Sequence, residues 1–147
     1  MPGRVDRLVS LKREIVIEAI NIFARKNSTR HDEVRAILAH LTEWDDITIR
    51  CIEAAIKQTP PPNYVENEDE FNAQAKAKWA NVLDTDLVTA FIKMNDLMVM
   101  MYRKSQTKTK RTIWPNRKET IGSSLQIDIK HHEEHLKQLQ NPPRTST

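Results

Sequence analysis

The sequence predicts an all-α protein, in which a long antiparallel helical hairpin and a long third helix form a bundle and a short helix follows a basic connector. Apolar residues recur at helical spacing over long stretches of the chain. The 147 residues include only two glycines, which leaves little material for the turns of β-hairpins. One cysteine cannot form an internal disulfide, so a disulfide-stapled extracellular fold is excluded.

The first two helices are predicted from their apolar stripes. The first covers about residues 4–25 and ends at the polar run 26–30. The second begins at Ser28 or Thr29, because Thr29 followed by Asp32 fits a capping pattern, and it extends to about Gln58. Since a short polar turn joins them, the two helices should pack as an antiparallel hairpin.

Three consecutive prolines after Gln58 end the second helix. A third helical stretch covers about residues 68–104, and we favour one continuous helix over a break at Asp84-Thr85-Asp86. A last amphipathic helix covers about residues 124–140. It is too short to be stable alone in water, so it must dock on the body or on another copy.

The charge pattern divides the chain into a helical bundle domain (1–104), a basic flexible connector (105–123) and a C-terminal helix with a tail (124–147). The net charge is +3, yet residues 103–118 hold seven basic residues and no acidic one. Such a segment is suited to nucleic acid or to an anionic surface, with one tryptophan available to stack on a base. The alternative is a solvated linker. The candidate residues are Arg103, Lys104, Lys108, Lys110, Arg111, Trp114, Arg117 and Lys118.

The most specific motif is Pro61-Pro62-Asn63-Tyr64, the PPxY pattern that WW domains bind. Polyproline II is preformed, so docking it loses little chain entropy. Pro61 and Pro62 would fill an aromatic groove, and the Tyr64 ring would fill a neighbouring pocket. The alternative is a plain proline turn with Tyr64 packed on the body.

Signatures of catalysis are absent from the sequence: there is no Walker A, GxGxxG or GxSxG pattern. Cys51 lies on an apolar stripe and is predicted to be a buried hydrophobe. Carboxylates such as Asp45 and Asp84 are predicted to be helix caps or solvated groups. We therefore expect no enzyme and no cofactor.

Two histidines share a helix face and could chelate one ion, since His131 and His135 are four residues apart. Their order is not HExxH, and the only histidines elsewhere are His31 and His40. His132 lies on the apolar stripe, where packing is expected. We therefore predict no metal site.

The order of features across residues 4–104 resembles a known family. A helical hairpin contains Leu41-Thr42-Glu43-Trp44, an acidic break follows at Glu66-Asn67-Glu68-Asp69-Glu70-Phe71, and a long amphipathic helix comes next. This order resembles the N-terminal helical region of Gag-like proteins from LTR retroelements of the BEL/Pao type. It is also similar to viral structural proteins of the retroviral matrix kind, in which a PPxY motif recruits ubiquitin ligases through WW domains.

The resemblance implies a partner-binding role for Pro61, Pro62 and Tyr64 alone. The chain has no zinc knuckle and no capsid homology motif, and Met1-Pro2-Gly3 is not a myristoylation start. Membrane targeting of the matrix kind is therefore not implied.

From these features we expect a non-enzymatic interaction or assembly protein that self-associates through its helices and recruits a WW-domain partner. One alternative is a small nucleic-acid-binding regulator that uses residues 103–118. Another is a structural subunit of a larger helical complex. No apolar run is long enough to cross a membrane, so an intracellular place in the cytoplasm or the nucleus is expected.

Overall fold

The computed structural model describes residues 2–25, 28–62, 67–108, 110, 112–113 and 120–141. The regular elements formed by these residues are all helices and none is a strand, which confirms the all-α fold class. None of the helices in the described part of the chain is long and apolar enough to cross a membrane. The elements are α1 (Pro2–Phe23), α2 (His31–Lys57), α3 (Glu68–Lys78), α4 (Asp84–Lys104), the 3-10 turn η1 (Gln106–Lys108) and α5 (Ile121–Gln140).

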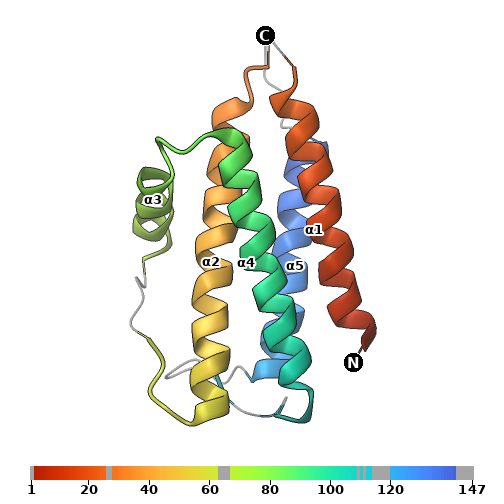
Figure 1. The fold of residues 1–147 in the computed structure, drawn as a ribbon, viewed down its shortest axis with the longest axis vertical. Helices are drawn as coiled ribbons and strands as arrows, with labels where there is room; N and C mark the ends of the chain where they lie inside the picture. The colour runs from red at the N-terminus through yellow and green to blue at the C-terminus, as the bar shows by residue number, and fades with distance from the viewer. Residues whose placement is uncertain are drawn as a thin grey trace.

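Helices α1, α2, α4 and α5 form a bundle, shown in Figure 1. Helices α1 and α5 run parallel to each other, and α2 and α4 run parallel in the opposite direction. The chief neighbour of α1 is α5, and the chief neighbour of α2 is α4. The first two helices are therefore antiparallel, as predicted, but each packs chiefly against a helix distant in sequence rather than against the other.

The third predicted helix is two helices, so the preference for one continuous helix was wrong. Helix α3 ends at Lys78 and α4 begins at Asp84. The Arg35 side chain of α2 donates to the carbonyl oxygens of Trp79 and Val82 at 2.7 and 2.5 Å, and to Asp84 Oδ1 at 2.5 Å. Arg35 thus satisfies carbonyls left without helical partners at this break, and α3 packs outside the bundle against α2 (Figure 1).

The start of α2 also differs from the predicted cap. Arg30 occupies the N-cap position and makes no side-chain capping bond. Its guanidinium instead donates to the carbonyl oxygens of Gln138 and Leu139 at 2.7 and 2.9 Å, near the end of α5. Arg30 therefore supplies donors to the last carbonyls of α5, which have no partner within that helix.

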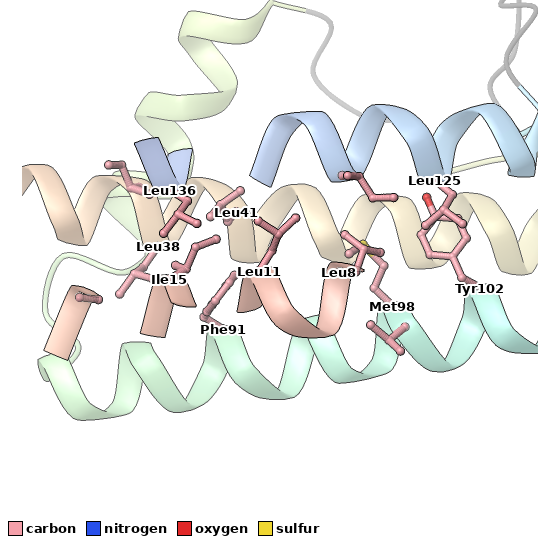
Figure 2. Packing of buried hydrophobic residues seen from close by; sticks show 14 of the residues in the cluster. Leu8, Leu11, Ile15, Leu38, Leu41, Phe91, Met98, Tyr102, Leu125 and Leu136 are labelled. Carbon is pink, nitrogen blue, oxygen red and sulfur yellow. The ribbon is translucent and has the colours of Figure 1, made fainter. Parts of the chain in front are cut away.

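The hydrophobic core runs along the inside of the bundle, and Figure 2 shows part of it. It includes Leu8 and Leu11 of α1, Leu38 of α2, Phe91 of α4 and Leu136 of α5. Since α5 belongs to this cluster, it docks on the body, one of the two placements that the sequence left open. Cys51 is buried in the same cluster, as predicted.

The described part of the connector is anchored by a residue that the sequence analysis missed. Ile113 is only 3% exposed and belongs to the core. A single isoleucine among polar residues has no periodicity to reveal it. Helix α5 then begins at Ile121, three residues before the predicted start, because Thr120 and Ser123 form a reciprocal capping box.

Candidate functional sites

The proline motif follows the end of α2. Gln58 adopts a left-handed backbone conformation with φ of 57°, and the Thr59 amide donates to the Ala54 carbonyl at 2.9 Å. These features are typical of a helix end. Pro60 is exposed, and Pro61 and Pro62 are half-buried. The remaining motif residue, Tyr64, lies outside the described residues.

The basic segment begins in the last turn of α4. Arg103 and Lys104 are exposed there, as is Lys110, while Lys108 is half-buried at the end of η1. The Arg103 guanidinium lies 3.6 Å from the Asp6 carboxylate of α1, so part of its charge is compensated. Arg111, Trp114, Arg117 and Lys118 lie outside the described residues.

A cluster of three histidines joins two helices that are distant in sequence. His131 and His135 lie one turn apart on α5, and His40 of α2 faces them. The His131 Nε2 atom lies 2.8 Å from His40 Nε2 and 3.1 Å from His135 Nε2. Three ring nitrogens thus converge within 4.8 Å of one another. The spacing of the sequence indicated only the pair on α5, His131 and His135, and gave no sign that His40 joins them.

Two of these rings have their other nitrogen beside a side-chain amide oxygen. His40 Nδ1 lies 2.5 Å from Asn72 Oδ1 of α3, and His135 Nδ1 lies 2.8 Å from Gln138 Oε1. An amide oxygen only accepts, so each Nδ1 carries the proton and donates it. In the neutral rings, Nε2 then presents a lone pair toward the cluster.

Burial keeps this cluster uncharged at neutral pH. Burial and repulsion from a protonated His135 lower the pKa of His40 to about 4. Burial and repulsion from His135 and His40 lower the pKa of His131 to about 3. Burial also lowers the pKa of His135. All three rings are therefore free of the protons that would compete with another cation.

A cleft of about 640 Å³ opens over the cluster. Helices α2, α3 and α5 all contribute to its wall, which includes the three histidines, Glu33 and Lys76, together with two carboxylates that act on His135, Glu68 and Glu134. Both carboxylates are exposed and raise the pKa of His135 against the larger effect of burial. The cleft thus combines neutral imidazoles with nearby negative charge.

A separate polar network lies in the core. Asp45 of α2 is 1% exposed, which corrects the prediction that it is a cap or solvated group, and His132 of α5 is 0% exposed. The Asp45 Oδ1 atom lies 3.3 Å from His132 Nε2, and Asn95 Nδ2 of α4 donates to Asp45 Oδ2 at 3.3 Å. His132 Nδ1 lies 2.7 Å from the Asp128 carbonyl oxygen.

His132 carries a positive charge at neutral pH. Burial by itself lowers the pKa of His132, but the charge of Asp45 and its hydrogen bond outweigh burial and raise that pKa to about 9. The protonated ring donates from both nitrogens, to Asp45 and to the Asp128 carbonyl oxygen. The prediction that His132 packs on the apolar side of its helix is correct in position, but the ring belongs to an ion pair.

A second buried pair lies beside this network. The Tyr102 hydroxyl of α4 donates to the Asp128 carboxylate and also contacts Ser124 Oγ at 3.0 Å. Burial raises the pKa of Asp128 to about 7, and burial also raises the pKa of Tyr102. These polar groups connect α4 and α5 through hydrogen bonds.

Comparison of the chain with protein-family models, with curated proteins and with solved structures finds no match in any of the three. The function is therefore inferred from the residues of this chain and their arrangement.

Proposed function

We propose that this chain is a non-enzymatic interaction and assembly protein, which recruits a WW-domain partner through Pro61, Pro62 and Tyr64. The observation that carries this proposal is the place of the motif in the chain. Pro60, Pro61 and Pro62 lie outside the helices, after the left-handed cap at Gln58, and Pro60 is exposed. A peptide there can adopt polyproline II without unfolding α2 or α3.

Replacing Tyr64 with Ala is expected to abolish binding to a panel of purified WW domains, because the ring would fill one of the two pockets that read the motif. Fluorescence anisotropy with the full chain measures the affinity. Pro60→Ala is the matched control, since Pro60 precedes the motif and should leave binding unchanged. Equal binding by the parent and Tyr64→Ala, or no binding by the parent, would contradict the recruitment proposal.

The assembly part of the proposal is supported by exposed apolar side chains. Ile17 and Ile20 of α1 are about half exposed, at 51% and 50%, and Leu97 and Met100 of α4 are similarly uncovered. Apolar side chains grouped on one face are typical of a protein contact. We propose that the α1 face carrying Ile17 and Ile20 contacts a second copy.

Light scattering at two concentrations is expected to show a dimer or larger assembly for the parent and a monomer for the double variant Ile17→Lys/Ile20→Lys. The matched control is Ile127→Lys on α5, where the side chain is 52% exposed. A parent that is monomeric at both concentrations, or an assembly that the double variant retains, would contradict this assignment.

A second candidate function, nucleic-acid binding, is favoured by the exposed side chains of Arg103 and Lys104 at the end of α4 and of Lys110 after η1. The same scattering experiment with a short RNA in low and high salt distinguishes it. Contacts to phosphates make affinity fall steeply with salt. A monomer that binds RNA only in low salt would favour this function over assembly.

A further inference from the structure

We propose that His40, His131 and His135 bind one divalent first-row transition-metal ion, of which Zn²⁺ is the best match, through their Nε2 atoms. The site joins α2 to α5 and lies at the cleft between α2, α3 and α5. It is independent of the PPxY motif, and nothing in the proposed interaction function requires it.

The three converging nitrogens have more lone pairs than protons to share among them. Asn72 and Gln138 hold the protons of His40 and His135 on Nδ1, so both Nε2 atoms present lone pairs. The His131 Nε2 atom contacts both, at 2.8 and 3.1 Å, and its single proton cannot make a linear hydrogen bond to each. With the His131 proton on Nδ1, all three Nε2 atoms present lone pairs, and one cation placed among them would satisfy all three at once.

The separations between the three nitrogens are near those of the histidine ligands in a tetrahedral zinc site. Zinc binds histidine nitrogen at about 2.0–2.1 Å in tetrahedral geometry, which places two ligand nitrogens about 3.3 Å apart. The contacts of 2.8 and 3.1 Å need to open by about 0.5 and about 0.2 Å, and the nitrogens of His40 and His135, which lie within 4.8 Å of each other, need to close by up to about 1.5 Å. Because His131 and His135 are one turn apart on α5, small rotations of the ring torsions supply this change.

Side-chain amides beside the ligands fix the orientation of two of the three rings. Histidines that bind metal almost always donate their other ring N–H to an oxygen, which fixes the tautomer and the orientation of the ring. Asn72 and Gln138 do this for His40 and His135.

The fourth position faces the cleft. Three protein ligands and an open position leave room for water or for a carboxylate, and Glu68 and Glu134 line the same cleft. Three imidazoles favour zinc, copper, nickel or cobalt over the hard cations magnesium and calcium. The ion would thereby attach the second half of α5 to the first half of α2.

Isothermal titration of the full chain without an affinity tag, using ZnCl₂ at pH 7, measures the site directly. We expect one ion per chain with a micromolar or tighter dissociation constant, and no binding of Mg²⁺. His135→Gln should weaken the affinity by more than about 100-fold, and Asn72→Ala by about 10- to 100-fold. The matched control is His31→Gln, because His31 pairs with Asp84 outside the cluster. Circular dichroism tests whether each variant keeps its helices.

A second measurement keeps the proposal testable if a variant unfolds. In the ¹⁵N-labelled parent chain, Zn²⁺ should shift the Nε2 resonances of His40, His131 and His135 and leave His31 and His132 unchanged. No zinc binding by the parent, equal binding by His135→Gln, or shifts confined to His31 or His132 would each overturn the proposal.

Discussion

Replacing Asp45 with Asn is expected to lower the free energy of unfolding by about 3–5 kcal/mol, the usual cost of removing one partner from a buried ion pair. Asp45 and His132 are both fully enclosed, and the pair spans α2 and α5. Asn has nearly the same shape, so the effect reports the lost charge rather than a cavity. Guanidinium denaturation at pH 7, followed by circular dichroism, measures the change.

The pH dependence of the free energy of unfolding provides a second measurement on the Asp45→Asn variant. The pKa of His132 rises from 6.5 in the unfolded chain to about 9 in the folded chain. The stability that this group contributes is therefore fully present below pH 6.5 and is lost as pH rises through 9. Asp45→Asn should remove this decline. Asp128 causes a separate decline, because burial raises its pKa to about 7, and the stability that this group contributes is lost as pH rises through 7. This decline at lower pH should remain in the variant.

The matched control is Asp46→Asn, one residue along α2. Asp46 pairs with Arg50 at 3.2 Å on the surface, where such pairs contribute about 0–1 kcal/mol. If Asp45→Asn changed stability no more than Asp46→Asn does, the buried pair would not be a major source of stability.

Replacing Phe91 with Ala is expected to lower the free energy of unfolding by about 3–5 kcal/mol, as for other fully buried aromatic residues. Phe91 is 0% exposed and is among the largest enclosed side chains of the core. Figure 2 shows it extending from α4 into the interior toward Leu11 and Ile15 of α1. Its removal leaves a cavity between helices whose backbones are held by other contacts, so the core can close only in part.

Leu97→Ala serves as the control for Phe91→Ala, because Leu97 is on the same helix and is 45% exposed. Its loss should cost less than about 1 kcal/mol. Equal costs for the two variants in urea denaturation would contradict the position of the core along α4.

Helical content could be predicted from the sequence because its causes are local. Apolar spacing predicted the spans of α1, α2 and α5 to within a few residues, and the proline run marked the end of α2. A break at Asp84-Thr85-Asp86 was considered but not favoured, because the carbonyl oxygens just before it are satisfied by Arg35, which lies more than forty residues away along the chain. A propensity argument contains no information about such a donor.

The candidate sites also divide into those that consecutive residues form and those that only the folded chain brings together. The PPxY motif and the basic segment are runs of consecutive residues, so a reading of the sequence finds them. Asp45 was misassigned because an isolated carboxylate on a helix is usually solvated, and only the bundle brings His132 and Asn95 to it.

The sequence by itself determined that this chain forms amphipathic helices, where most of them lie, and which short motifs it carries, because these properties depend on residues a few positions apart. Only the tertiary structure decided that α1 packs on α5 and α2 on α4, since many pairings would bury the same apolar stripes. The same bundle also places α2 against α5, which brings His40 to His131 and His135, and Asp45 to His132. Both clusters join residues more than eighty positions apart, a separation that only packing of the whole bundle can close.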